Sequence, residues 1–315
     1  MMDTAHSGAR ATSTANNNQE PAGDDVPTLV IDTSFGATVG VVGHEPHYEP
    51  DSRSHVEKLQ PAIDSMVAEA GLVPADIRRV VVGTGPAPFT GLRAGIVAAR
   101  AIGLATGAQV LGQDILEPQA VWVDSMTNPD GRRHLTLAVN DARRKQLYYA
   151  LYEKRPDSPI PHRILDMDIA YAGHIAHRIN EWLRGRDTPE GGEIVIDICG
   201  KGALRYIDAF QGIVALGQVL DDSALHGAGA EGPAIMERLA LAHLKAGDGC
   251  PTEPLYLRRP DVSQPAPLKH VMTAEDLQKE AEKRGTAPAD TSASPRVPDG
   301  IPKEASDGET KGDVR

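Results

Sequence analysis

The segment GTGPAPFTGLRAGIVAARAIGLATG, residues 83–107, places a loop rich in glycine and proline directly before a strongly apolar helix. Arg93 and Arg100 are its only charged residues, and their spacing puts them on one stripe of the helix. A helix this apolar must be buried on more than one side. Small residues also recur at every fourth position of the segment: Gly91, Gly95, Ala99, Gly103 and Gly107.

This ridge of small residues predicts close packing against another backbone. Gly95 and Gly103 each cost about 1 kcal/mol relative to alanine inside a helix, and a closely approaching element offsets that cost. The protein's own sheet and a partner protein are the two candidates. In one arrangement the ridge faces the sheet and Ile96 and Arg100 lie outside. The sequence does not show which face of the helix meets the sheet and which meets a partner.

The first half of the chain predicts a strand meander followed by alternating helices and strands. TLVIDT (28–33) and ATVGVVG (37–43) form a hairpin pattern, and Ser54 and Glu57 form a capping box at a helix start. The expected elements are strands at 28–33, 37–43 and 46–52, a helix at 54–70, a strand at 79–83, the helix at 91–107 and a strand at 109–111.

The second half predicts the same order of elements. These are strands at 135–143, 146–153 and 163–168, a helix at 170–184, a strand at 193–199, a short helix to Phe210, a strand at 213–220 and a helix at 233–245. The fold class is therefore α/β, with two ribonuclease-H-like subdomains of the actin and sugar-kinase (ASKHA) architecture, each with a mixed sheet of βββαβαβ order. The expected domains are 27–125 and 133–262, the last helix packing back toward the first domain, between disordered tails at 1–26 and 263–315.

Charge and cysteine content narrow the class of protein. A net charge of −12 argues against binding nucleic acid alone, because phosphate binding requires a basic surface. Cys199 and Cys250 lack the spacing of a metal or redox pair and suit a reducing cytosol. Residues 1–26 do not resemble a signal peptide, and the apolar run 94–108 is too short to span a bilayer. We expect a cytoplasmic protein without a membrane partner.

Asp32 and Asp141 end the first strand of each half, where kinases of this architecture hold metal–nucleotide phosphates. A nucleotide site also needs a glycine-rich turn, but only Gly36 follows Asp32 closely and no glycine follows Asp141 directly. Both aspartates also fit a structural role as caps of tight turns. They are the candidate nucleotide-binding residues, and both interpretations stay open.

Other motifs do not predict catalysis or a metal site. The loop Gly83-Thr84-Gly85 resembles a phosphate cradle, yet the following prolines remove backbone donors. A metal site on the first helix needs a second histidine four residues after His55, and that position is Leu59. We therefore expect no catalytic or metal-binding residues, and we interpret His55 as an interfacial polar residue.

Five segments together resemble the TsaB (YeaZ) family, a partner subunit in bacterial synthesis of N6-threonylcarbamoyladenosine (t6A) on tRNA. Phe-Thr-Gly-Leu-Arg at 89–93 is the most specific match, although Ala87-Pro88 stands where the family has glycine–serine. The matching segments are 28–42, 54–72, 80–112, 139–153 and 254–262.

The resemblance implies a non-catalytic scaffold or activator for t6A formation at A37 of tRNAs that read ANN codons. Its partners would be a TsaD-like catalytic subunit and a TsaE-like ATPase, with tRNA bound only through the complex. It would need no cofactor of its own, ATP being used by the assembled complex. The implied partner interface uses the helices at 54–70 and 91–107, and a homodimer through the same surface is an alternative. Its residues are His55, Leu59, Ile63, Phe89, Leu92, Arg93, Ile96 and Arg100.

Two other classes of function remain alternatives. The chain would be a self-sufficient enzyme of the same architecture, either a small-molecule kinase or a glycoprotease-like metallopeptidase, if it held phosphate loops or metal ligands. An independent tRNA-binding module is disfavoured by the acidic charge.

Overall fold

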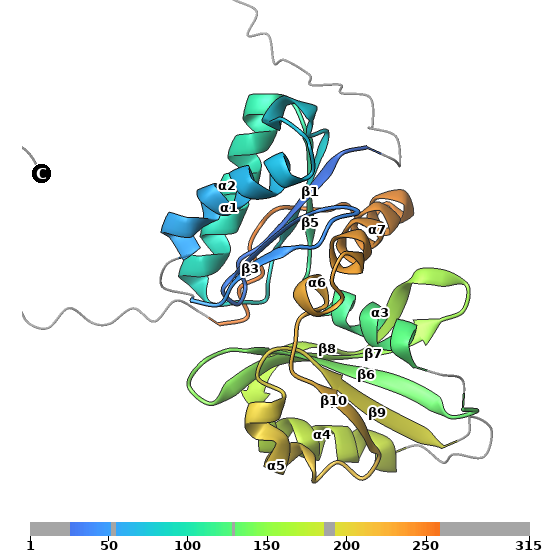
Figure 1. Cartoon of the computed structure of the whole chain (residues 1–315). Coiled ribbons are helices and arrows are strands. Elements are labelled where there is room, and N and C mark those ends of the chain that lie inside the picture. The colour runs from blue at the N-terminus through green and yellow to red at the C-terminus, as the bar shows by residue number, and fades with distance from the viewer. Residues whose placement is uncertain (1–25, 52–54, 128–129, 186–192, 259–315) are drawn as a thin grey trace, which may run out of the picture. The chain divides into compact units, whose positions relative to one another are not determined.

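The computed structural model describes residues 26–51, 55–127, 130–185 and 193–258, within one compact unit (Figure 1). Two five-stranded sheets organise this unit, one from each half of the chain. The predicted tails, apart from Val26, and the capping residue Ser54 lie outside the described residues.

The first sheet has the strand order β3-β2-β1-β4-β5. Neighbouring strands from β1 to β3 pair antiparallel, and β1, β4 and β5 pair parallel. Both faces are covered, so β1, β2 and β4 are buried at every residue. The elements of this half are β1 (Thr28–Asp32), β2 (Ala37–Val41), β3 (His47–Glu49), α1 (His55–Glu69), η1 (Pro74–Asp76), β4 (Arg79–Gly83), α2 (Phe89–Thr106), β5 (Gln109–Gln113) and α3 (Glu117–Met126).

The second sheet has the order β10-β9-β6-β7-β8. It mirrors the first sheet, with an antiparallel β6–β7–β8 meander and parallel β6–β9–β10 pairing. Its elements are β6 (Arg133–Asp141), β7 (Gln146–Arg155), β8 (Ser158–Tyr171), α4 (Ala172–Arg184), β9 (Ile194–Cys199), η2 (Leu204–Tyr206), α5 (Ile207–Phe210), β10 (Leu216–Leu220), α6 (Ala224–Gly227) and α7 (Glu231–Ala246).

The predicted fold class is confirmed, because each half forms a mixed sheet in the βββαβαβ order. Helix α3 was not predicted. Its start is fixed by Asp114, whose Oδ1 accepts hydrogen bonds from the Leu116 and Glu117 amides at 2.9 and 2.8 Å. Polar Glu117 and Gln119 lie on its buried side, which weakens the apolar periodicity that marks a helix.

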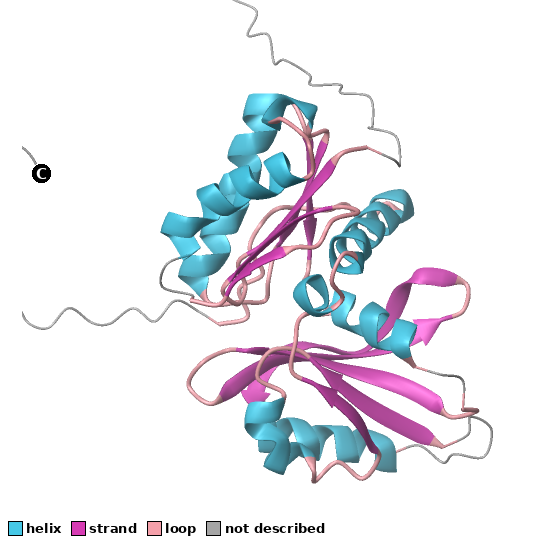
Figure 2. Cartoon of the chain, in the orientation of Figure 1, coloured by secondary structure: helices cyan, strands magenta, loops and turns pink. Residues whose placement is uncertain are grey.

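Helices α3 and α7 each pack on the sheet of the other half (Figures 1 and 2). Met236 and Ala240 of α7 share a core with Val30 and Val81 of the first sheet. Ile115 and Leu116, just before α3, and Ala120 within it share a core with Ala138, Ala150 and Tyr152 of the second sheet. Helices α1 and α2 cover the other face of the first sheet, and α4 covers the other face of the second.

The ridge of small residues on α2 faces the first sheet. A β-carbon at Gly95 would lie 2.5 Å from Oγ1 of Thr33, and one at Gly103 would lie 2.3 Å from Cγ2 of Val110. Close packing therefore requires glycine at these positions. Ile96 is buried with the ridge, so the alternative that placed Ile96 outside is wrong; Arg100 is exposed.

No helix among the described residues is both long enough and apolar enough to cross a bilayer.

Replacing Gly95 by alanine is expected to lower the free energy of unfolding by about 1–2 kcal/mol in urea denaturation. Overpacking of the buried, β-branched Thr33 outweighs the gain of about 1 kcal/mol in helix propensity. Gly173→Ala in α4 is the matched control, because nothing lies within 4 Å of the point that its added β-carbon would occupy. Equal stability of the two variants would contradict the packing argument.

Candidate functional site

A cleft of about 410 Å³ opens between two hairpin turns, one from each sheet. The β1–β2 turn contributes residues 33–36, and the β6–β7 turn contributes Arg143 and Arg144. A cleft of this size is typical of a small-molecule site. The topology thus brings together two turns that are far apart in the sequence.

Asp32 lies beside this cleft, at the end of β1. It lines a small cavity of about 10 Å³ that shares Ser34 and Phe35 with the cleft. Its Oδ1 accepts a hydrogen bond from the Ser34 amide at 2.9 Å, the interaction of an Asx turn. Burial raises the pKa of Asp32 above its usual range. The turn-capping role is present in the structure, and the nucleotide role stays a prediction.

Asp141 makes the corresponding contact at the end of β6. Its Oδ1 accepts a hydrogen bond from the Arg143 amide at 2.8 Å, and its Oδ2 forms an ion pair with Arg205 at 2.6 Å. The guanidinium offsets the charge of this carboxylate. A metal–nucleotide complex would therefore have to compete with Arg205 for Asp141.

The basic side of the cleft was missed in the sequence. Three arginines and one carboxylate line it, so its side chains carry an excess of positive charge in an acidic protein. Arg143, Arg144 and Lys145 have φ values of 61°, 52° and 62°, a left-handed run that non-glycine residues rarely adopt. A search for glycine-rich phosphate turns does not find such a site. The basic tripeptide after a strand-ending aspartate is the signal that could have revealed it.

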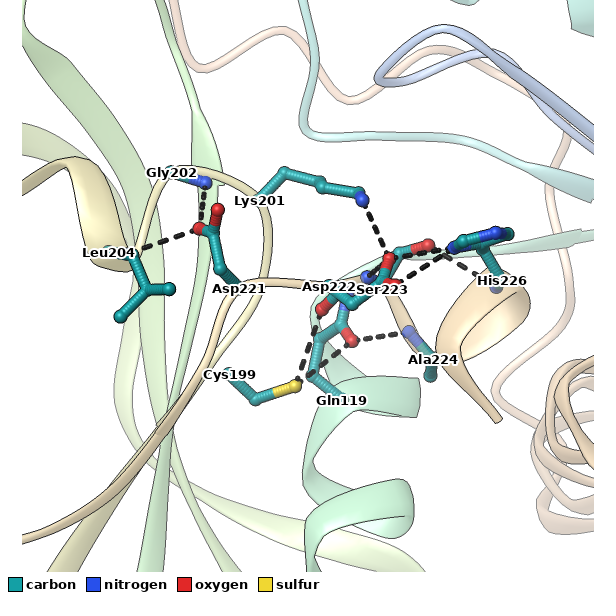
Figure 3. A network of polar contacts seen from close by, with 10 residues as sticks. All are labelled: Gln119, Cys199, Lys201, Gly202, Leu204, Asp221, Asp222, Ser223, Ala224 and His226. Carbon is teal, nitrogen blue, oxygen red and sulfur yellow. Dashed lines mark hydrogen bonds and ion pairs between the residues drawn. The ribbon is translucent and has the colours of Figure 1, made fainter. Parts of the chain in front are cut away.

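A polar network joins α3 to the second sheet near this cleft (Figure 3). Oε1 of Gln119 accepts a hydrogen bond from the Ala224 amide at 2.6 Å and one from the Cys199 thiol at 3.5 Å. Burial raises the pKa of Cys199 well above its usual range, so this thiol stays protonated. Cys199 is a structural residue rather than a nucleophile.

Lys201 extends the same network toward the first sheet. Its ammonium pairs with Asp222 at 2.7 Å and lies 5.0 Å from the centre of the Tyr48 ring. Asp222 also lies 2.9 Å from Nδ1 of His226, whose ring centroid is 4.4 Å from that of Tyr48. The network therefore links β3 of the first half with the loop after β10.

Half of the predicted interface residues are buried in this chain's own core. Leu59, Ile63, Leu92 and Ile96 are each no more than 4% exposed and pack together under α1 and α2. The prediction that they contact a partner is wrong, because their apolar surface is already covered by the first sheet. The side chain of His55 lies outside the described residues.

The other three predicted interface residues reach the surface but contact the segment that follows α7. Phe89 stacks on Tyr256 with centroids 5.0 Å apart, and Nε of Arg93 donates a hydrogen bond to the Tyr256 hydroxyl at 2.8 Å. Arg100 forms an ion pair with Glu253 at 2.9 Å. This surface is therefore partly covered by the chain itself.

Two large apolar side chains remain on the outer side of α2. Val97 is 65% exposed and Leu104 is 90% exposed, and their spacing of seven residues puts them on one stripe. We call Val97, Ala101 and Leu104 the outer stripe of α2. Among the described parts of the chain, no group of three His, Cys, Asp or Glu side chains is placed to hold a metal ion.

The fold and cleft define a protein with two ribonuclease-H-like domains, of the actin and sugar-kinase architecture. YeaZ from Pseudomonas aeruginosa has this fold, with a TM-score of 0.52 and 23% identity over 74% of this chain and 100% of that chain. Residues 46–158 match the family model described as TsaD, tRNA N6-adenosine threonylcarbamoyltransferase.

Curated relatives point to one family. The tRNA threonylcarbamoyladenosine biosynthesis protein TsaB of Escherichia coli is 28% identical over 132 residues, covering 40% of this chain and 54% of that protein. The uncharacterized protein Rv3421c of Mycobacterium tuberculosis is 40% identical over 131 residues, covering 39% and 58%. The match thus spans little more than half of these relatives. The comparisons confirm the resemblance to the TsaB (YeaZ) family.

A cluster of titratable side chains lies where α3 contacts α7. Nε2 of His243 is 2.7 Å from Oε2 of Glu117, and its Nδ1 is 3.0 Å from Asp248. The hydrogen bond to Glu117 raises the pKa of His243 to about 9. Burial and the nearby Glu117 charge raise the pKa of Asp114 to about 7. The protonated His243 thus helps to hold α3 and α7 together.

We expect the protein to lose stability as the pH rises from 6.5 to 9. The pKa of His243 is raised on folding, so its contribution is complete below pH 6.5 and disappears as the folded state releases its proton near pH 9. Thermal unfolding across this range measures the effect. His243→Gln should flatten the profile, whereas His177→Gln, at an exposed position on α4, should leave it unchanged. An unaltered profile in His243→Gln would refute the assignment.

Proposed function

We propose that this chain is a non-catalytic subunit of the machinery that forms t6A at A37 of tRNAs reading ANN codons. The resemblance to TsaB proteins carries the proposal, supported by the matching TsaD family model. On this proposal the chain binds a TsaD-like catalytic subunit and stabilises its active form. The family model matches residues 46–158, and the matching segment of the Escherichia coli relative covers 40% of this chain.

The arrangement of the cleft supports a non-catalytic role. Asp141, which would contact a metal–nucleotide complex in a kinase, is paired with Arg205. Leu59, at the position where a second metal-binding histidine would stand, is buried in the apolar core. Both positions are thus used by the fold itself.

The outer stripe of α2 is the surface we propose for the TsaD-like subunit. Its exposed Val97 and Leu104 would lose contact with water on binding, which favours association. The acidic chain leaves tRNA binding to its partners, and ATP is used by a TsaE-like ATPase in the assembled complex. A homodimer through the same stripe is the competing use of this surface.

Reconstitution of tRNA modification tests the proposed function. The TsaD-like and TsaE-like partners, with the enzyme that supplies the threonylcarbamoyl adenylate, are incubated with tRNA with and without the full chain. Nucleoside analysis by mass spectrometry should detect t6A only when the chain is present. Equal t6A yields in its absence would refute an activating role.

The double substitution Val97→Glu with Leu104→Glu should reduce co-purification with the TsaD-like subunit by at least about tenfold. Binding would bury the two introduced carboxylates against apolar surface. This costs more than the 1.4 kcal/mol that corresponds to a tenfold change in affinity. Both residues are exposed, so circular dichroism should show an intact fold. Val214→Glu, at a residue that is 89% exposed in the second half, is the matched control and should bind normally. Normal binding by the double variant would exclude the outer stripe as the interface.

A further inference from the structure

Arg93 lies near the start of α2 and is held in one orientation by two aromatic side chains. Its Cζ lies 3.8 Å from the centre of the Phe89 ring, and its Nε donates a hydrogen bond to the Tyr256 hydroxyl at 2.8 Å. Phe89 and Tyr256 are themselves stacked, with ring centroids 5.0 Å apart. A long side chain fixed in this way loses little further conformational freedom on binding. The guanidinium is therefore oriented before any partner arrives.

The charge of Arg93 is not neutralised within the described part of the chain. Arg100, seven residues further along the same helix, pairs with Glu253 at 2.9 Å and also donates to the Thr252 carbonyl at 3.0 Å. Among the described residues no carboxylate pairs with Arg93, and its contacts to the two aromatic side chains leave the terminal nitrogens available. A guanidinium in this state can donate paired hydrogen bonds to a carboxylate.

We propose that Arg93 pairs with a carboxylate of the protein that covers Val97 and Leu104, and thereby selects a different protein over a second copy of this chain. The inference rests on the proposed function, which assigns the outer stripe of α2 to a TsaD-like subunit. Arg93 precedes Val97 by four residues and Leu104 by eleven, so the three side chains lie on one face of the helix. At about 1.5 Å per residue, Arg93 and Leu104 are about 16 Å apart along the helix axis. One partner surface can therefore contact both the apolar pair and the guanidinium.

Helix α2 cannot supply this carboxylate to a second copy of the chain. Its 18 residues, Phe89–Thr106, include no aspartate or glutamate. Packing α2 against α2 of a second copy would bury Arg93 without an opposite charge, and an unpaired buried charge strongly disfavours association. A homodimer through the outer stripe is therefore less favourable than a complex with a partner that presents an acidic side chain.

A nucleic acid is a poorer match for the same surface. Binding to its phosphates requires several available cations, but Arg100 is already paired and the chain carries a net charge of −12. Val97 and Leu104, which are 65% and 90% exposed, present apolar surface on the same face as Arg93. Apolar side chains beside an arginine are typical of the central part of a protein–protein interface.

Isothermal titration calorimetry of the full chain with the TsaD-like subunit, at low and at moderate salt, tests the pairing. Arg93→Gln should weaken binding by about tenfold, the typical effect of losing hydrogen bonds between charged groups. The variant should also lose less affinity than the parent when the salt concentration rises, because salt screens an ion pair. Arg238→Gln on α7 removes the same charge from an exposed arginine paired with Glu231, so it is the control and should bind normally.

A second variant separates the orientation of Arg93 from its charge. Tyr256→Phe keeps the ring that stacks on Phe89 and removes only the hydroxyl that accepts the hydrogen bond from Nε. It should weaken binding by about two- to threefold, because the guanidinium must then be ordered during binding. Arg93 and Tyr256 are both exposed, so circular dichroism should show an intact fold in both variants.

Three results would overturn the pairing. The first is an unchanged affinity of Arg93→Gln for the TsaD-like subunit. The second is an equal loss of affinity in Arg238→Gln, which would indicate a general charge effect. The third is a dimer of the isolated chain, measured by light scattering, that Arg93→Gln dissociates, or binding of tRNA by the isolated chain that this variant abolishes.

The same measurements distinguish failure of the pairing from failure of the proposed function. If Val97→Glu with Leu104→Glu prevents binding and Arg93→Gln does not weaken it, the outer stripe remains the interface and only the pairing is wrong. If the parent chain does not bind the TsaD-like subunit at all, the pairing and the proposed function are both contradicted.

Discussion

The buried guanidinium of Arg79 determines where α7 lies, the final helix among the described residues. Arg79 begins β4 and is fully buried, and its Nη1 forms an ion pair with Oε1 of Glu237 on α7 at 2.6 Å. The Thr28 hydroxyl donates to the same carboxylate at 2.5 Å. A buried charge that loses its partner costs several kcal/mol, so the first sheet is complete only when a helix from the second half packs on it.

The cleft follows from this requirement. Helix α7 crosses to the first sheet, α3 crosses to the second, and the two helices contact each other beside α6. The segment after α7 also joins both halves, because the Leu255 amide donates to the Thr84 carbonyl at 2.8 Å and Arg258 donates to the Ala142 carbonyl at 2.9 Å. These links hold the β1–β2 and β6–β7 turns on either side of one cleft. The shape of the cleft thus depends on α3 and α7, which each pack on the sheet of the other half, and not on either sheet alone.

Periodicity in the sequence was sufficient to predict the two sheets and most of their helices, because apolar residues repeat strongly there. It could not predict α3, whose buried positions include Glu117 and Gln119. Those side chains are tolerated because Glu117 forms a hydrogen bond with the His243 ring and Gln119 accepts one from the Ala224 amide. Such contacts join residues more than a hundred positions apart, and no local pattern contains them.

The predicted site was less accurate than the fold for a related reason. Apolar spacing identifies residues that avoid water, but it does not distinguish the core of one chain from an interface between two. Leu92 and Ile96 satisfy the spacing and lie inside, whereas Val97 and Leu104 break the periodic face and lie outside. On an apolar helix, the residues that contact a partner are therefore expected among the apolar residues that lie outside the periodic core face.

The two strand-ending aspartates show how the fold uses carboxylates within its own turns. A carboxylate at the end of the first strand of each half is compatible with holding a metal–phosphate complex, and both are present as Asp32 and Asp141. Each instead accepts a backbone amide of its own turn, and Arg205 neutralises the second. A ligand that used either carboxylate would first have to displace these contacts. In this structure the two aspartates therefore serve the turns of the fold itself.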